Sequence, residues 1–153
     1  MIQLKKAMPN DLEKVLEARY RTLRAVFGLK EDYVFDGNFR AATRNYYEKE
    51  DQTTVVAFDG EAVVGCATIC YMTVVPTPDH PAGKRGHIMN VHTEEAYRRQ
   101  GIGSRMMNFL IDEAKERGVT EISLDATDEG RLLYEKCGFQ ASVEGMMLAL
   151  HNK

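Results

Sequence analysis

Tryptophan is absent from this 153-residue sequence, and cysteine occurs only three times. No apolar run approaches the roughly 18 residues that would predict a membrane-spanning helix, and residues 1–6 lack the apolar centre of a secretion signal. The sequence also has no large excess of either charge, because 20 Lys and Arg stand against 23 Asp and Glu, for a net charge of −3. Nucleic-acid-binding domains usually carry a basic excess. We therefore expect a cytoplasmic protein whose partners include neither nucleic acid nor membrane.

The three cysteines are Cys66, Cys70 and Cys137. Their odd number and scattered positions form no disulfide framework, which is typical of a reducing compartment. Cys66 and Cys70 fall in an apolar stretch that predicts a strand, where four residues separate them by about 13 Å. That distance is too long for joint chelation, so we expect no metal site.

The length favours one domain, spanning residues 1–153, with a core of its own. Apolar periodicity and the Gly, Pro and Asp punctuation predict helices and strands in a mixed order. Strands are expected at 2–4, 53–58, 62–75, 86–92, 121–124 and 146–150, and helices at about 9–27, 38–49, 102–118 and 129–136. This order predicts an α/β (α+β) fold with a mixed, mostly antiparallel sheet flanked by helices.

The glycine-containing segment between the predicted strand 86–92 and the next helix carries the strongest functional signal. It comprises Arg98, Arg99, Gln100, Gly101, Ile102, Gly103 and Ser104. Backbone N–H groups at a helix N-terminus have no intrahelical partner, and the helix dipole favours negative charge there. The segment therefore predicts a site for a phosphate or diphosphate group.

Two other phosphate motifs do not fit. A Walker A loop needs Lys and then Ser or Thr after its second glycine, but Ser104 and Arg105 follow Gly103. A dinucleotide fingerprint needs a third glycine where Met106 stands. A purely structural alternative also exists, in which Gly101 and Gly103 only permit a tight turn from strand to helix.

Together with a second motif, this segment resembles the GNAT acetyltransferases. Arg98-x-x-Gly101-x-Gly103 resembles their acetyl-CoA signature, and residues 133–139, Leu-Tyr-Glu-Lys-Cys-Gly-Phe, resemble their downstream Leu-Tyr-x-x-x-Gly-Phe motif. The resemblance covers nearly the whole chain and implies a central sheet of about seven strands. It also implies acetyl-CoA as cosubstrate and transfer of its acetyl group to a primary amine by direct attack in a ternary complex.

The resemblance assigns roles to particular positions. Tyr134 would be the general acid that protonates the leaving thiolate, and a backbone N–H near Asn90 would stabilise the oxyanion, which makes these two the expected catalytic residues. Tyr134 also has an alternative role as a core aromatic. The expected cofactor-binding residues are Met89, Asn90, Val91, Arg98, Arg99, Gln100, Gly101, Ile102, Gly103, Ser104, Thr127 and Tyr134. Thr127 stands where the family often has Asn, and the connection from Val91 to Arg98 is about two residues longer than usual.

The strand 86–92 has no acidic residue to act as a general base, although many relatives have a Glu nearby. The candidates for that base are His87, His92, Glu94, Glu31 and Asp32. Alternation along the strand would put His87, Met89 and Val91 on one face and Ile88, Asn90 and His92 on the other. The lack of a carboxylate keeps a second hypothesis open, a non-catalytic module that senses CoA or acyl-CoA. A small-molecule or peptide amine is the expected acceptor, and a homodimer is possible.

Overall fold

The computed structural model describes residues 1–151. Its strands are β1 (Ile2–Lys6), β2 (Gln52–Asp59), β3 (Ala62–Thr73), β4 (Lys84–Thr93) and β5 (Glu121–Leu124). Its helices are α1 (Leu12–Val26), α2 (Gly37–Lys49), α3 (Ile102–Glu116) and α4 (Arg131–Lys136), with single turns η1 (Pro9–Asp11) and η2 (Glu95–Tyr97). The mixed fold class and these elements confirm the expected order as far as α4.

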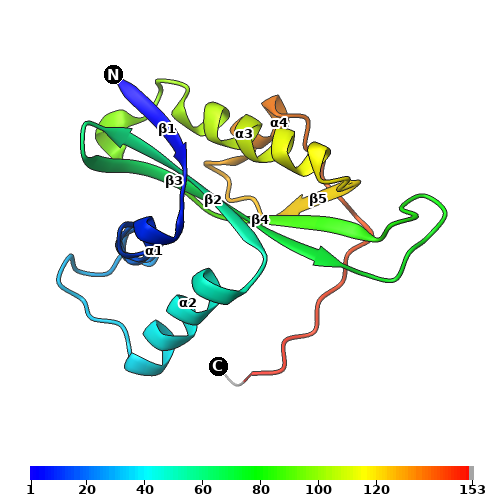
Figure 1. The fold of residues 1–153 in the computed structure, drawn as a ribbon, viewed down its shortest axis with the longest axis horizontal. Helices are drawn as coiled ribbons and strands as arrows, with labels where there is room; N and C mark the ends of the chain where they lie inside the picture. The colour runs from blue at the N-terminus through cyan, green and yellow to red at the C-terminus, as the bar shows by residue number, and fades with distance from the viewer. Residues whose placement is uncertain (152–153) are drawn as a thin grey trace.

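The five strands form one sheet in the order β1-β2-β3-β4-β5. The first three pairings are antiparallel, and β4 pairs with β5 in parallel. Helices α3 and α4 lie on one face of the sheet, and α1 and α2 lie on the other (Figure 1). The parallel pair is the part of this arrangement on which the candidate site depends.

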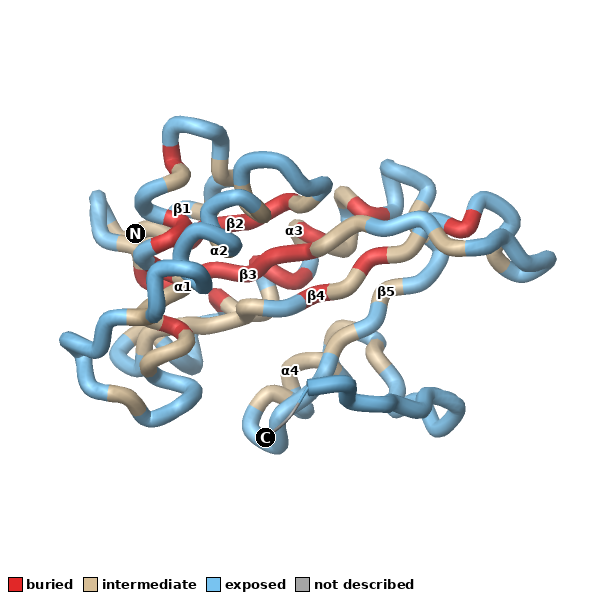
Figure 2. The backbone as a smooth tube through the Cα atoms, turned by 90° about the horizontal axis from the view of Figure 1, so that it is seen from below, coloured by how far each residue is buried: buried red, intermediate tan, exposed pale blue. Residues whose placement is uncertain are grey.

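The expected strand at 146–150 is wrong, and the sheet has five strands rather than about seven. Residues 145–150 form no regular secondary structure, although their apolar composition predicts a strand. A strand needs a neighbour for its backbone hydrogen bonds, and this segment lies beside none in the described chain. Figure 2 shows it exposed, while the central strands are buried.

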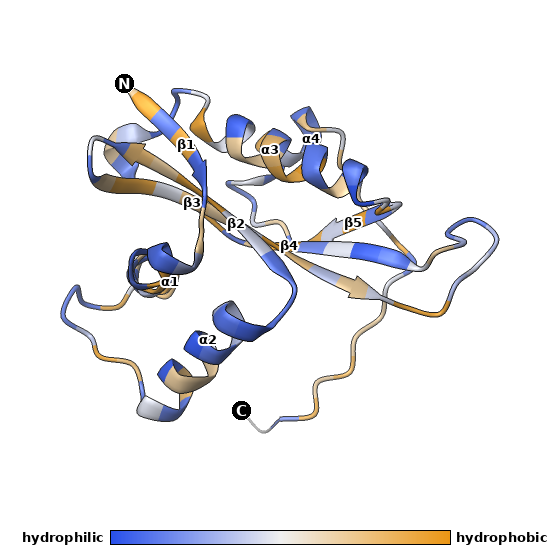
Figure 3. Ribbon diagram, viewed as in Figure 1, coloured by the Kyte–Doolittle hydropathy of each residue, from blue (hydrophilic) through white to orange (hydrophobic). Residues whose placement is uncertain are grey.

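The two faces of the sheet pack differently. The face under α3 is an apolar core, in which the buried residues are Val55, Ala57, Val64, Ala67, Ile69, Ile88, Ile102, Met106, Met107, Leu110 and Ala114. The face under α1 and α2 buries hydroxyl and thiol groups, among them Thr54 and Thr68, whose Oγ1 atoms are 2.8 Å apart. Figure 3 colours α2 largely hydrophilic and much of β2 and β3 hydrophobic.

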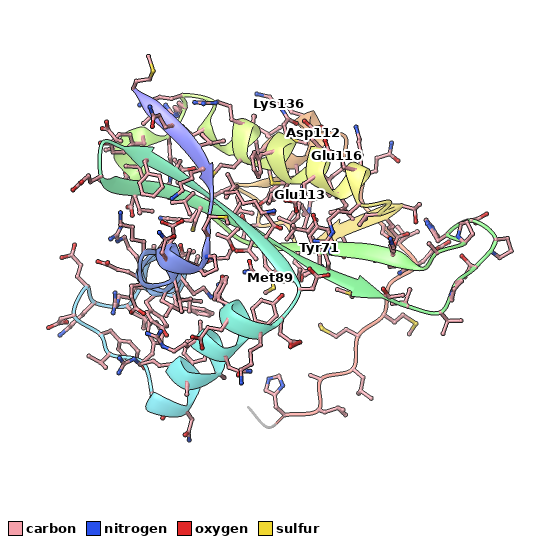
Figure 4. The ribbon with its side chains drawn as sticks, in the orientation of Figure 1. Tyr71, Met89, Asp112, Glu113, Glu116 and Lys136 are labelled. Atoms are coloured by element: carbon pink, nitrogen blue, oxygen red, sulfur yellow. The ribbon has the colours of Figure 1, made fainter. Side chains whose placement is uncertain are left out.

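A polar anchor ties α3 to the sheet. Tyr71 on β3 donates a 2.6 Å hydrogen bond to Glu113 on α3, and Lys6 forms a 3.0 Å ion pair with the same carboxylate. Both Tyr71 and Glu113 are labelled in Figure 4. The guanidinium of Arg117 lies 3.6 Å from the centre of the Tyr71 ring. These contacts hold α3 in register with β3, and with it the N-terminus of the helix.

Candidate active site

The parallel strands β4 and β5 separate part of the way along β4. Their pairing runs from Arg85↔Glu121 to Ile88↔Leu124, where β5 ends, while β4 continues to Thr93. From Met89 onward the edge of β4 therefore has no partner in β5. Met89, labelled in Figure 4, is 46% exposed at this point. The separation leaves backbone groups of a central strand free to bind a ligand.

A bulge in β4 lies at the same place. Thr68 pairs with Met89 and Cys66 pairs with His92, so two residues of β4 stand opposite one residue of β3. Asn90 has a φ of 60°, in the left-handed region that few residues other than glycine adopt. Such bulges re-aim side chains and are common beside functional sites.

The bulge makes the expected alternation of side chains wrong. Val91 packs with Ile88 against the α3 core instead of lying on the face opposite to it. Asn90 points instead toward α1, where it meets Arg19. The left-handed residue inserts an extra step into the pleat, so the period of two is lost after Met89.

Three residues that the sequence analysis missed hold Asn90. Arg19 on α1 donates a 3.1 Å hydrogen bond from Nη1 to the Asn90 Oδ1 atom, and Asn90 Nδ2 lies 3.4 Å from the Tyr47 hydroxyl on α2. The Cys66 thiol donates to the Asn90 carbonyl oxygen at 3.5 Å. No local pattern in the sequence pointed to this cluster, because its members come from α1, α2, β3 and β4.

Burial keeps the Cys66 thiol and the Tyr47 phenol of this cluster in their neutral forms. It raises the pKa of the Cys66 thiol to about 11, so Cys66 stays protonated and can donate its hydrogen bond. Burial also raises the pKa of Tyr47. Neither group has the lowered pKa that an activated nucleophile requires. Arg19 is the cation that touches Asn90.

The glycine segment begins α3 as expected. Gly101 has a φ of 78° and Arg99 a φ of 65°, so two left-handed residues turn the chain into the helix. The first N–H groups of α3 have no partner within the helix, whereas that of Arg105 bonds to the Gly101 carbonyl at 3.1 Å. A Cβ atom on Gly101 would meet nothing within 4 Å, so space remains for an anion. These residues fit a diphosphate.

The two glycines have different surroundings. A Cβ atom on Gly103 would lie 3.0 Å from Leu133 on α4, so the small size of Gly103 allows α4 to pack closely on α3. The Arg98 side chain bonds through Nε to the Thr93 carbonyl at 3.0 Å and closes the connection that contains η2. The side chain of Ile102 is buried, whereas Gln100 is exposed and Ser104 is intermediate.

Tyr134 lies on α4, partly buried against the α3 core, with its ring 6.2 Å from that of Phe139. Burial raises its pKa, and the neighbouring Cys137 adds to the shift, so the phenol is protonated at neutral pH. The Thr127 hydroxyl accepts a 3.1 Å hydrogen bond from the Gly130 N–H and so organises the turn that precedes α4. Contacts of Tyr134 and Thr127 with a cofactor remain predictions.

The candidate bases lie in different surroundings. His92 is partly buried, burial lowers its pKa, and its Nε2 lies 3.9 Å from the Glu94 carboxylate. Glu94 also bonds to Arg21 on α1 at 3.3 Å. The Nδ1 of His87 is 2.7 Å from the hydroxyl of Ser123 on β5.

The remaining candidates, Glu31 and Asp32, are exposed in the connection between α1 and α2.

Residues 1–151 contain no cluster of three or more His, Cys, Asp or Glu side chains that would hold a metal ion. No helix in this part of the chain is long and apolar enough to cross a membrane.

Comparison with known proteins finds a matching family and solved structures with the same fold. Residues 13–139 match the Acetyltransferase (GNAT) family. A crystal structure of a predicted acetyltransferase with acetyl-CoA from Clostridium acetobutylicum is 29% identical, covers 97% of this chain and 96% of its own, and has a TM-score of 0.83. The glucosamine-6-phosphate N-acetyltransferase of Arabidopsis thaliana shares the fold, with a TM-score of 0.70, 21% identity and coverage of 99% of each chain.

Sequence relatives match over shorter stretches. A probable glucosamine 6-phosphate N-acetyltransferase of Oryza sativa is 39% identical over 69 residues, which are 45% of this chain and 40% of that protein. The Arabidopsis thaliana glucosamine 6-phosphate N-acetyltransferase is 38% identical over 56 residues, which are 37% of this chain and 38% of its own. The match thus spans about 40% of the length of these relatives. On the family match over residues 13–139, this chain belongs to the GNAT acetyltransferase family.

Proposed function

We propose that this protein is an N-acetyltransferase that moves the acetyl group of acetyl-CoA to a primary amine by direct attack in a ternary complex. The observation that carries the proposal is the separation of β4 from β5 after the Ile88↔Leu124 pair, with a bulge at Asn90. An unpaired strand edge of this kind would offer its backbone N–H groups to a thioester carbonyl, whose oxygen needs a hydrogen-bond donor as negative charge develops on it.

The start of α3 supports acetyl-CoA as the cosubstrate. The free N–H groups after Gly101 would bind its diphosphate, and Arg98, Arg99 or Arg105 would add positive charge nearby. Guanidinium groups pair well with phosphate oxygens because they present several donors in one plane. Acetyl-CoA supplies an activated acyl group, so no metal and no covalent acyl-enzyme is needed. Cys66, protonated and bonded to the Asn90 carbonyl, supports this direct route.

Three groups of the chain would then carry the proton and charge movements. A backbone N–H within residues 89–91 would stabilise the oxyanion as the amine attacks. Tyr134 would protonate the leaving thiolate, and its raised pKa keeps it protonated but makes it a weak acid. Among the candidate bases, His92 is kept neutral by burial, so we would test it first.

The acceptor is proposed as a small-molecule amine. The relatives from Oryza sativa and Arabidopsis thaliana are named for glucosamine 6-phosphate, which makes an amino sugar phosphate the first acceptor to test. Aminoglycosides, polyamines and peptide N-termini belong in the same panel. Incubation with acetyl-CoA and each amine, while free thiol is followed, tests the activity. CoA binding without thiol release above background would instead make the protein a non-catalytic sensor.

Gly101 and Gly60 provide a matched pair for the cofactor site. Both glycines have positive φ, at 78° and 62°, and a Cβ atom on either would meet nothing within 4 Å. Alanine at either position therefore carries a similar backbone strain, about 1–2 kcal/mol. Only Gly101→Ala should move the N–H groups of α3, with CoA binding weakened about 10-fold or more by calorimetry. Equal CoA affinity of the two variants would overturn the proposed diphosphate site.

A further inference from the structure

Arg19 is a cation that faces the bulge of β4 without a carboxylate partner. It is partly buried on α1, and its Nη1 donates a 3.1 Å hydrogen bond to the side-chain oxygen of Asn90. No Asp or Glu of residues 1–151 lies within ion-pair distance of its guanidinium. Glu94, just beyond the end of β4, pairs instead with Arg21 at 3.3 Å. A guanidinium presents several N–H donors, so Arg19 has donors to spare for a ligand.

A chain of hydrogen bonds fixes the direction in which the Asn90 amide faces. Gln52 Nε2 donates to the Tyr47 carbonyl at 3.4 Å, so its Oε1 accepts the 2.8 Å bond from the Thr54 hydroxyl. Each hydroxyl has one proton to donate. The proton of Thr54 is used in this bond, so Thr68 donates to Thr54 at 2.8 Å, and Tyr47 in turn donates to Thr68 at 3.4 Å. The Tyr47 hydroxyl is then left to accept a hydrogen bond.

The donor to the Tyr47 hydroxyl is the Asn90 side chain. Its Nδ2 lies 3.4 Å from the hydroxyl oxygen, which leaves Oδ1 as the atom that accepts from Arg19. The hydroxyl chain therefore orients the amide, and the amide holds the guanidinium beside the bulge. A bond to a neutral amide oxygen leaves the charge of Arg19 without a counterion, and an anionic ligand would supply one.

Arg19 lies on the face of the sheet from which the acceptor would approach. The start of α3, where we propose that the CoA diphosphate binds, belongs to the face that α3 and α4 cover, whereas α1 and α2 cover the opposite face (Figure 1). A thioester held at the free edge of β4 would therefore receive an amine from the side of α1 and α2. This is the side on which Arg19 meets Asn90.

We propose that Arg19 binds an anionic group of the acceptor, so that the substrate is an amine that also carries a carboxylate or a phosphate. This inference rests on the acetyl transfer proposed above and adds the class of its acceptor. The planar guanidinium matches both anions, because it offers parallel N–H donors to two oxygens. The same charge repels a second ammonium group in the acceptor, so polyamines and aminoglycosides are disfavoured.

Pairs of acceptors that differ only in the anionic group test the proposal. Glucosamine 6-phosphate is compared with glucosamine, and free glycine with glycinamide, by thiol release from acetyl-CoA. In at least one pair, Arg19→Gln should lower kcat/KM of the anionic member about 10-fold or more relative to its neutral partner. Loss of the Asn90 contact acts on both members alike, so the ratio isolates the charge. Arg19→Lys keeps the charge and should retain part of the selectivity.

Arg24→Gln is the matched control. Arg24 also lies on α1, is also partly buried, and bonds through Nε to the Tyr33 carbonyl at 2.9 Å instead of facing Asn90. Its guanidinium lies 5.7 Å from the centre of the Phe35 ring. This substitution should leave the selectivity within both pairs unchanged. If Arg19→Gln changes neither ratio, or if Arg24→Gln changes them equally, the proposal is overturned.

Calorimetry separates this proposal from the proposed acetyl transfer. Glucosamine 6-phosphate and glycine are titrated into the CoA-bound protein, and Arg19→Gln should weaken binding of at least one of them about 10-fold or more without any turnover. Absence of thiol release with every amine would contradict acetyl transfer alone. Binding of neither probe to the unaltered protein, or equal binding to Arg19→Gln, would overturn the role of Arg19, as would thiol release that favours polycationic amines.

Discussion

At position 90 the backbone conformation should reverse the usual order of stability of glycine and alanine variants. In an ordinary strand position, glycine is less stable than alanine by about 0.5–1 kcal/mol, because it loses more conformational freedom on folding. At a φ of 60° the order inverts, since the Cβ atom of alanine meets steric strain of about 1–2 kcal/mol that glycine avoids. We therefore expect Asn90→Gly to be the more stable of the two variants.

The contacts of Asn90 also give the stability that each variant should lose relative to the unaltered protein. Either substitution removes the 3.1 Å bond from Arg19 to the Asn90 side chain, a charge-assisted bond worth about 1.5–3 kcal/mol. Asn90→Gly recovers part of this loss through relief of strain, for a net loss of roughly 0.5–2 kcal/mol, whereas Asn90→Ala recovers none. In an Arg19→Leu background, the loss caused by Asn90→Gly should shrink.

Urea unfolding of the two variants measures this difference. Met72 on β3 provides the control, because it is 44% exposed and has no positive φ. There, Met72→Ala should be more stable than Met72→Gly. Thiol release extends the test to function, since Asn90→Gly keeps the bulge and should lose less kcat than Asn90→Ala. If Asn90→Ala is as stable as Asn90→Gly, the left-handed bulge is not occupied in solution and the reasoning fails.

Two further predictions concern proton transfer and pH. Tyr134→Phe should lower kcat about 10- to 100-fold with little change in the KM for acetyl-CoA, because it removes the proposed proton donor but keeps the ring packing; an unchanged kcat in the thiol-release assay would exclude that role. Burial lowers the pKa of His92 below 6.5, so the unfolded chain takes up the proton first as the pH falls. The contribution of neutral His92 to stability is therefore complete above pH 6.5 and is lost below it. Urea unfolding at pH 7.5 and 5.5 should show that His92→Gln loses less stability on acidification than the unaltered protein does. Identical losses in both proteins would contradict this.

Local patterns in the sequence predicted most of the fold correctly. Apolar periodicity predicted the helix at about 102–118, which is α3, and the Gly and Asp punctuation separated the strands expected at 53–58 and 62–75, which pair as the hairpin of β2 and β3. These signals are local, because a helix face repeats every 3.6 residues and a tight turn depends on one or two residues with positive φ. The start of α3 at Gly101 was predicted for the same reason, since a helix N-terminus is defined by its own neighbours in the chain.

The cluster around Asn90 could not be predicted in this way. Arg19 and Tyr47 lie 71 and 43 positions away from Asn90 in the chain, and they meet it only because α1 and α2 cover the same face of the sheet. The role of Gly103 is similar, because its small size serves Leu133, which lies thirty positions further on. Contacts between distant segments leave no periodic signal in a single sequence.

The continuous apolar run at residues 146–150 indicated strand propensity, and the glycines and arginines at 98–103 predicted a helix start suited to an anion. Only the tertiary structure decided that the strand-forming segment has no partner within the single chain. The tertiary structure also decided that β4 leaves β5 beside Asn90. The physical reason is that propensity and capping act between near neighbours, whereas strand pairing and the fit of a bulge depend on where the rest of the chain lies.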